Sequence, residues 1–161
     1  MPDKLQNLLR NMKSLNKDVV MSDMINNAIR ANEDQIIELN TRKQIYDKGI
    51  RSDGAKIKLF GKNYEIYSRG YTRHKRSKGL YRGKVDLNYS GDYLASYEIQ
   101  YFLNKIEIEP SAAQADLGAI LRDMYGEEIE GLTPENLEKM AKIITPNLRK
   151  QLLNYLKNGN N

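Results

Sequence analysis

The sequence predicts an α+β fold, in which a small antiparallel sheet accompanies helices clustered at the N- and C-terminal ends of the chain. Apolar residues recur at three- and four-residue spacing in the first third of the chain and again after residue 111, which indicates amphipathic helices. Between these regions, residues 97–109 contain two short runs that alternate apolar and polar residues, as a β-hairpin does. Helices and strands that are segregated in this way favour the α+β class over an alternating α/β fold.

The length and composition are those of one globular domain. With 161 residues the chain can bury one core, and we expect a single domain made of N-terminal helices (1–49), a basic loop and sheet region (50–110) and C-terminal helices (111–157). No apolar run approaches the roughly 20 residues that cross a bilayer, and residues 1–16 lack the apolar core of a signal peptide. We therefore expect no membrane partner and synthesis in the cytoplasm.

The residues that usually carry catalysis are scarce. The chain has no cysteine and one histidine, His74, so disulfides and thiol catalysis are excluded and a zinc site has almost no ligands. Asp86, Asp92 and Glu98 could in principle hold magnesium for phosphodiester cleavage. Asp92 is better explained as a first-turn helix acid and Glu98 as an exposed strand residue. We expect no metal, no cofactor and no enzymatic activity.

Two helices are predicted at the N-terminal end. The first covers residues 5–15, where leucines and a methionine form one stripe. The second is expected to run from about Ser22, a good N-cap, to Lys48. Gly49 suits the left-handed residue that commonly closes a helix.

Residues typical of turns recur in the middle of the chain, between residues 50 and 96. Short strand candidates lie at residues 55–60, 64–67 and 85–87. Residues 64–67 also fit the approach to a helix that starts at Ser68, and the sequence leaves both readings open. Ser90 can cap a brief helix that ends at Ser96.

The clearest hairpin comprises residues 97–102 and 105–109. Alternation predicts that the first run presents its large apolar residues on one face and that the second run has two isoleucines pointing inward. The expected inward set is Tyr97, Ile99, Tyr101, Ile106 and Ile108, and the expected outward set is Lys105, Glu107 and Glu109.

The C-terminal region is again helical. Residues 112–125 are expected to form a helix that Gly126 ends. Its apolar stripe is Leu117, Ile120, Leu121 and Met124. Thr133 and Pro134 are a strong helix start, because threonine caps and the fixed φ of proline suits the first position. Pro146 then either kinks one long helix or divides two.

The segment from Ile66 to Lys84 is basic and rich in tyrosine, and it contains no acid. Its cations are Arg69, Arg73, Lys75, Arg76, Lys78, Arg82 and Lys84. The whole chain has 26 basic and 21 acidic residues, so removing these seven leaves 19 against 21 and turns a net charge of +5 into −2. The basic character is therefore local, and these residues are candidates for contact with DNA or with an acidic partner.

Several positions of this region follow an order that resembles tailed-phage virion-morphogenesis and tail-completion proteins. The matching positions are Tyr67, Ser68, Thr72, Lys75, Gly79, Ser90, Gly91 and Ser96, with the apolar lead of residues 85–87 before the serine and glycine. Residues 125–135 and the helix that ends at Leu156 are similar to the closing part of that pattern. The resemblance covers roughly residues 51–156 in order.

The resemblance implies a structural role in the virion. It implies an α+β subunit, not an enzyme, that assembles with itself into a ring and joins neighbouring head-tail proteins in the neck or tail. Cyclic assembly uses head-to-tail contacts between two different faces of the subunit. Residues 107–161 hold nine acids and six bases, so the basic segment of one subunit is expected to meet the acidic C-terminal portion of another.

Nucleic acid is the alternative partner of the basic segment. Arginine and lysine neutralise phosphates, and tyrosine stacks on unpaired bases, so residues 66–84 could make a nucleic-acid-binding protein without sequence preference. In a ring, the same residues could meet DNA that passes through the channel. A loop that faces only water is the third interpretation.

Overall fold

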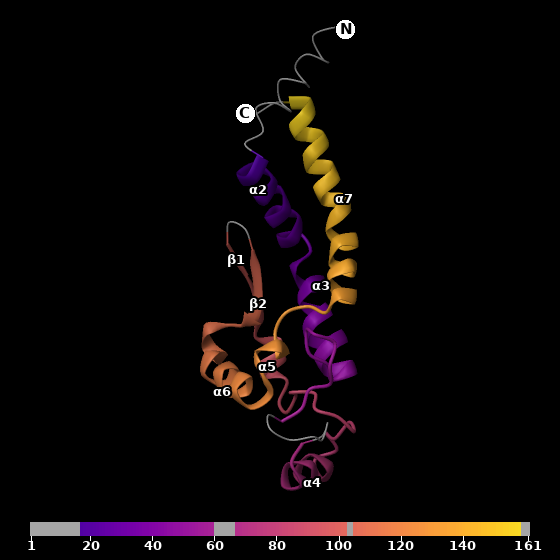
Figure 1. Ribbon diagram of the computed structural model, residues 1–161, viewed down its shortest axis with the longest axis vertical. Coiled ribbons are helices and arrows are strands. Elements are labelled where there is room, and N and C mark those ends of the chain that lie inside the picture. The colour runs from indigo at the N-terminus through magenta and orange to yellow at the C-terminus, as the bar shows by residue number, and fades with distance from the viewer. Residues whose placement is uncertain (1–16, 60–66, 103–104, 159–161) are drawn as a thin grey trace.

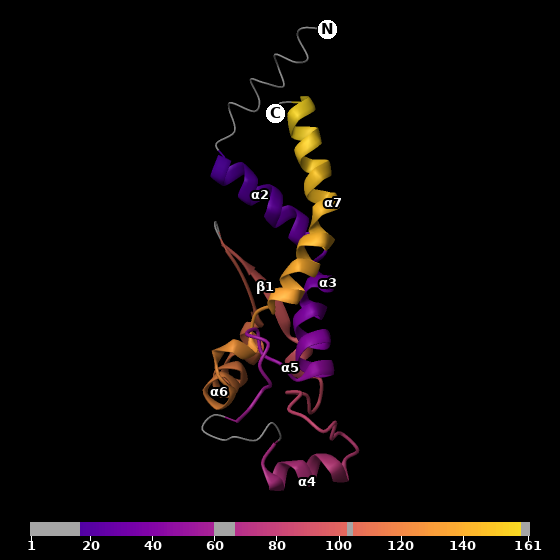
Figure 2. The same ribbon diagram turned by 45° about the vertical axis from the view of Figure 1, so that its right-hand side comes forward.

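The computed structural model describes residues 17–59, 67–102 and 105–158, and its architecture is α+β as predicted (Figure 1). Helices lie toward both ends of the chain, and the sheet is a two-stranded antiparallel hairpin. The molecule is elongated. Helix α7 (Pro134–Asn158) runs along one half, and α4 (Arg69–Ser77) lies at the opposite end (Figures 1 and 2).

The N-terminal helical region consists of α2 (Lys17–Arg30), α3 (Glu33–Glu38) and the π-helix η1 (Leu39–Tyr46). The helix predicted over residues 5–15 lies outside the described residues. One continuous helix from Ser22 to Lys48 is wrong, because α2 already includes Lys17 and the helix breaks near Asn32, whose φ is −135°. The Asn32 side chain donates to the Ala28 carbonyl at 2.8 Å, an alternative bond that competes with helical pairing.

Gly49 closes this region as predicted. Its φ is +62°, and its N–H donates to the Ile45 carbonyl at 2.9 Å. A Cβ at this position would lie 2.7 Å from the carbonyl oxygen of Val85. The absence of a side chain therefore lets the end of the helical region approach the 85–87 segment closely.

We expect Gly49→Ala to lower the free energy of unfolding by about 1–3 kcal/mol, because the new methyl group meets both an unfavourable φ and the Val85 carbonyl. Gly54→Ala is the matched control, since Gly54 has a φ of +82° but nothing lies within 4 Å of its Cβ position. Urea denaturation followed by circular dichroism measures both. Equal losses would show that backbone strain acts alone and that the contact with Val85 is unimportant.

The short strands predicted at residues 55–60 and 85–87 are wrong for the parts that the structure describes. Lys56 makes a single isolated bridge with Ile50. Residues 85–87 are buried and pair with no strand, and Leu87 has a φ of +47° that interrupts extended geometry. A strand needs a partner edge, and no described strand pairs with this segment.

The hairpin is confirmed. β1 (Tyr97–Tyr101) pairs antiparallel with β2 (Ile106–Pro110), and Ile99 lies opposite Ile108. Both isoleucines are buried, as the predicted inward face requires. Just before the hairpin lies the brief helix α5 (Asp92–Ala95). The N-cap is Gly91 and not the predicted Ser90, whose Oγ accepts from the Asp92 N–H at 3.3 Å at the entry to the helix.

The C-terminal region follows the prediction closely. A 3₁₀ turn, η2 (Ala112–Gln114), leads into α6 (Ala115–Tyr125), and Gly126, with a φ of +94°, ends it. A second 3₁₀ turn, η3 (Glu127–Ile129), precedes α7. Helix α7 includes Pro146, so the proline does not divide it. Helix α7 packs against α2, so the described N-terminal and C-terminal helices are in contact.

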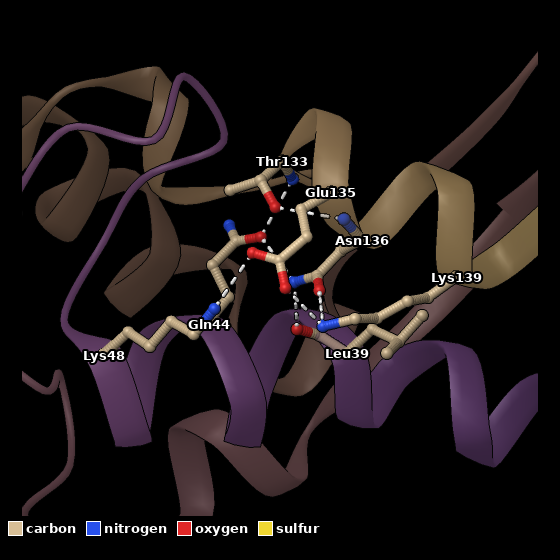
Figure 3. Close-up of polar contacts among 7 residues, drawn as sticks. All are labelled: Leu39, Gln44, Lys48, Thr133, Glu135, Asn136 and Lys139. Atoms are coloured by element: carbon tan, nitrogen blue, oxygen red, sulfur yellow. Dashed lines mark hydrogen bonds and ion pairs between the residues drawn. The ribbon is translucent and has the colours of Figure 1, made fainter.

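A buried polar junction connects η1 to the start of α7 (Figure 3). Gln44 is fully buried, and its Nε2 donates to the Gly131 carbonyl at 2.9 Å. Its Oε1 accepts from the Thr133 backbone N–H at 2.9 Å and from Asn136 Nδ2 at 3.2 Å. Asn136 Nδ2 also donates to the Leu39 carbonyl at 2.9 Å. The amide groups of Gln44 and the Asn136 Nδ2 therefore bond to partners from a distant part of the chain.

Thr133 caps α7 as predicted, because its Oγ1 accepts from the Asn136 N–H at 3.2 Å. At the exposed rim, Glu135 pairs with Lys139 at 2.7 Å and with Lys48 at 3.1 Å (Figure 3). The hydrogen bond from Lys139, followed by that from Lys48, lowers the pKa of Glu135. Exposed pairs of this kind contribute little stability, so the buried amides position the two elements.

Candidate interaction site

Helix α4 is specified at both ends by positions that carry the family resemblance. Ser68 is its N-cap and accepts from the Tyr71 N–H at 3.4 Å. Gly79 follows its other end with a φ of +69°, and its N–H donates to the Arg76 carbonyl at 3.0 Å. Residues 69–77 therefore form a capped helix, which agrees with the helix start considered at Ser68 and not with a loop. Residues 64–66 lie outside the described residues.

The inner face of α4 carries two polar anchors. Thr72 Oγ1 donates to the Tyr67 carbonyl at 3.0 Å. Lys75 is 0% exposed, and its Nζ donates to Asp86 Oδ1 at 2.5 Å and to the Asn88 carbonyl at 2.7 Å. The same ammonium group lies 4.6 Å from the centre of the Tyr67 ring. Helical spacing puts residues 72 and 75 on one side, so both anchors point toward the protein.

Asp86 is the centre of this buried network and is 1% exposed. Besides the Lys75 ammonium, its Oδ1 accepts from the Tyr67 hydroxyl at 2.8 Å and from the Asn88 N–H at 3.2 Å. The Asp86 N–H donates to the Tyr67 hydroxyl oxygen at 3.1 Å. Burial, followed by the negative charge of Asp86, raises the pKa of Tyr67 well above its ordinary value. The network therefore fixes α4 to the 85–88 segment.

The network corrects two interpretations of single residues. Lys75 was predicted among the cations that contact DNA or a partner, and this role is wrong because its side chain is enclosed by protein. Asp86 was considered with Asp92 and Glu98 as a magnesium ligand, but it binds the Lys75 ammonium instead. Among the described residues, no three acidic, histidine or cysteine side chains gather as a metal site would require.

The other six predicted contact residues keep their cationic groups at the surface. Arg69, Arg73, Arg76, Lys78 and Arg82 are exposed, and Lys84 is half-buried. None of the six forms an ion pair with an acid in the described part of the chain. Two of them rest on tyrosine rings, Arg76 over Tyr81 at 4.8 Å and Arg82 over Tyr46 at 4.2 Å.

An open cavity of about 550 Å³, here called the tyrosine groove, separates α4 and α5 from α6. Five tyrosines line it, together with leucines, a methionine and a few polar residues. Those tyrosines are Tyr67, Tyr71, Tyr89, Tyr93 and Tyr125. Burial raises the pKa of Tyr125 to about 12, so its hydroxyl stays protonated at neutral pH. The groove has the size of a small binding site and predominantly apolar walls.

The mouth of the tyrosine groove is aromatic. Tyr71 is 38% exposed and Tyr89 is 47% exposed. The Tyr89 ring stacks on the His74 ring, with ring centres 5.7 Å apart, and Tyr89 Oη lies 3.0 Å from His74 Nε2. Helical spacing puts Arg69, Arg73 and Arg76 on the other side of α4 from Tyr71 and His74, so the aromatic rings alone face the groove.

The predicted apolar stripe of α6 is largely exposed. Leu117 is 39%, Ile120 is 55% and Met124 is 38% exposed, while Leu121 is half-buried. Leu117, Leu121 and Met124 line the tyrosine groove. Periodicity correctly placed these residues on one face, but it could not show that no other described element covers that face.

The remaining positions of the resemblance build the opposite wall and its support. Ser90 and Gly91 line the tyrosine groove, and Gly91 has a φ of +99°. Ser96 Oγ donates to the Tyr93 carbonyl at 2.8 Å, and its carbonyl accepts from the Ser111 N–H at 2.8 Å. These residues therefore shape the turn that presents Tyr93 to the groove.

A second cavity of about 480 Å³, here called the glutamate cleft, lies between the hairpin and the start of α7. Its acids are Glu107, Glu109, Glu127 and Glu130. Arg122 is the only base that lines it among the described residues, and its guanidinium pairs with Glu130 at 2.7 Å. Burial raises the pKa of Glu130, and the charges of Glu109 and Glu127 act in the same direction against the effect of Arg122. The cleft thus concentrates negative charge.

No protein-family model, curated protein or solved structure matches this chain. None of the helices in the described residues is both long enough and apolar enough to pass through a bilayer.

Proposed function

We propose that this protein is a structural subunit of the head-tail connection of a tailed phage, assembling as a ring with itself and with portal or tail proteins in the virion. One observation carries the proposal: the positions that resemble tail-completion proteins, far apart in the sequence, act together in one structural unit. They cap α4, anchor it through the Lys75 and Asp86 network, and shape the wall of the tyrosine groove.

The exposed surface supports a binding role. The tyrosine groove and the exposed face of α6 form an apolar surface, whereas the buried charges of Lys75 and Asp86 satisfy each other. Contiguous exposed apolar surface in a folded protein marks a contact with a partner. A ring subunit needs such a surface because every copy contacts two neighbours.

The solution mass tests this proposal. We expect the purified protein, alone or mixed with the portal and tail proteins of the same phage, to give assemblies of defined subunit number by native mass spectrometry. Gold-labelled antibody against the protein should mark the neck or tail of intact virions in electron micrographs. A protein that stays monomeric with all those partners and is missing from virions would contradict the proposed function.

Sequence-tolerant binding of nucleic acid is the second candidate. It is favoured by the five exposed cations of residues 69–82, which form no ion pair with an acid among the described residues. Arg69, Arg73 and Arg76 are spaced by four and three residues, which puts them along one side of α4. If they meet phosphates, binding of a labelled oligonucleotide must weaken steeply as salt rises. The variant Arg69→Gln/Arg73→Gln/Arg76→Gln should then reduce the log–log salt slope by about 2–3. Undetectable binding at low salt would exclude this candidate.

A further inference from the structure

Helix α4 separates the arginines of the basic segment from its exposed aromatic rings. Tyr71 lines the tyrosine groove, together with Tyr89. The three arginines of α4 follow one another at four- and three-residue spacing along another side of the helix, here called the arginine side. They are Arg69, Arg73 and Arg76. Cations and tyrosines that alternate in the sequence therefore face different surroundings in the fold.

The arginine side is polar over its whole length. Helical spacing places Gly70 and Ser77 beside the three arginines, and all five residues are exposed. Helix α4 contains no acid, and it lies at one end of the molecule (Figures 1 and 2). Contacts between proteins have a largely apolar centre from which charged residues are depleted. The arginine side lacks such a centre, and it suits a partner with an anionic, hydrophilic surface.

The guanidinium groups of the arginine side are unpaired, and the helix that carries them is fixed. None of the three arginines forms an ion pair with an acid in the described part of the chain. Lys75, buried on the inner face of α4, fixes the helix to Asp86. The Arg76 guanidinium lies 4.8 Å from the centre of the Tyr81 ring, which restricts its movement. Groups held in position lose less conformational freedom when they bind an anion.

We propose that the arginine side of α4 binds the phosphate backbone of duplex DNA. This contact rests on the nucleic-acid candidate described above and adds the form of nucleic acid and the surface that meets it. The row from Arg69 to Arg76 is about 10 Å long, which corresponds to about three phosphates along one strand. Arginine pairs with phosphate through parallel hydrogen bonds, and serine hydroxyls contact phosphates as well.

The position of the aromatic rings favours a duplex over a single strand. Proteins that bind single strands stack the bases on aromatic side chains. Tyr81, the tyrosine in contact with the arginine side, is half-buried, and the Arg76 guanidinium covers its ring. The exposed rings of Tyr71 and Tyr89 lie at the tyrosine groove instead. Unpaired bases therefore find no free ring on the arginine side, whereas a duplex keeps its bases paired and presents its phosphates.

The glutamate cleft of a second copy is the competing partner for these cations. Apolar side chains line that cleft together with its acids, among them Leu132, Leu137 and Met140. Contact with the arginine side would leave these side chains without apolar partners, because the exposed residues of that side are arginines, a glycine and a serine. A phosphate backbone brings no apolar surface that must be covered, so the arginine side fits it better.

Salt-dependent binding tests the contact. Fluorescence anisotropy of a short labelled DNA duplex is measured with the native chain and with Arg69→Gln/Arg73→Gln/Arg76→Gln. Between about 50 and 200 mM salt, three phosphate contacts account for about a 40-fold loss of affinity, so the affinity of the variant should fall about 40-fold less than that of the native chain. A single strand of the same sequence should bind the native chain several-fold more weakly, because its charge density is lower.

Two further variants serve as controls. Lys142→Gln/Arg149→Gln/Lys150→Gln removes the same charge from exposed positions of α7 and should keep the native salt dependence. Tyr71→Leu/Tyr89→Leu removes the exposed rings at the tyrosine groove and should leave the affinity for the duplex unchanged. Circular dichroism checks that every variant folds.

The outcomes separate this contact from the functions proposed above. Equal loss of salt dependence in the two glutamine variants would overturn the arginine side as the binding surface. Tighter binding of the single strand, weakened by Tyr71→Leu/Tyr89→Leu, would overturn the duplex and leave the nucleic-acid candidate intact. Undetectable binding of either probe at low salt would overturn both, while the connector role would still depend on the solution mass and the virion labelling.

Discussion

Asp86→Leu is expected to lower the free energy of unfolding by about 3–5 kcal/mol, because it leaves the Lys75 ammonium buried without a counterion. Lys75 is fully buried and would retain only the Asn88 carbonyl as a hydrogen-bond acceptor and the Tyr67 ring as a neighbour. Domains of this size have a total stability of about 5–15 kcal/mol, so the loss is a large fraction of it. The chain has no tryptophan, so urea denaturation is followed by circular dichroism.

Two double variants show whether the loss comes from the unpaired charge. Lys75→Met/Asp86→Leu removes both charges from the buried site and should recover much of the stability, since apolar residues of similar size often replace a buried ion pair at little cost. Lys78→Met/Asp86→Leu removes an exposed cation of the same region and should recover none. Equal behaviour of the two double variants would mean that Lys75 is not the charge that Asp86 neutralises.

Gln44→Met is expected to cost about 2–4 kcal/mol, because it keeps the side-chain volume but removes the partner of the Thr133 N–H and one partner each of Asn136 and the Gly131 carbonyl. Each buried polar group that loses its partner costs about 1–3 kcal/mol. Asn40 Nδ2 still donates to the Gly131 carbonyl, which limits the damage there.

The neighbouring substitution Lys43→Met is the control for Gln44→Met, since Lys43 lies in the same π-helix but is exposed. Thermal and urea denaturation of both variants measure the difference. A loss below about 0.5 kcal/mol for Gln44→Met, the range of ordinary surface substitutions, would show that the polar junction does not hold η1 to α7.

The sequence predicted an element correctly where residues within that element determine where it begins, ends or pairs. Thr133 caps α7, Gly126 ends α6, and the alternation of residues 97–109 gave the hairpin its correct faces. The sequence also left open a helix that starts at Ser68, which is α4, but the density of cations after it equally suited a loop. A cap followed eleven residues later by glycine was the signal that could have identified the helix.

The errors concern interactions between distant residues. The residues around Lys75 in the sequence do not show that its ammonium group pairs with Asp86. That ion pair depends on how the 85–88 segment folds back against α4. The stripe of α6 was found, but exposure of Ile120 depends on which elements lie nearby, and periodicity contains no such information. The helix breaks near Asn32, whose side chain bonds to the Ala28 carbonyl, whereas the same residue elsewhere can remain helical.

The polar junction of Figure 3 also sets the order in which the chain can acquire its native structure. Its hydrogen bonds join residues 87 to 97 positions apart. At ordinary rates of translation, the segment containing Gln44 leaves the ribosome about 5–20 s before its partners. Until then the amide of Gln44 can bond only to water or to transient neighbours. The contacts that hold the N-terminal helices to α7 can therefore form only late in synthesis, although the helices themselves are made earlier.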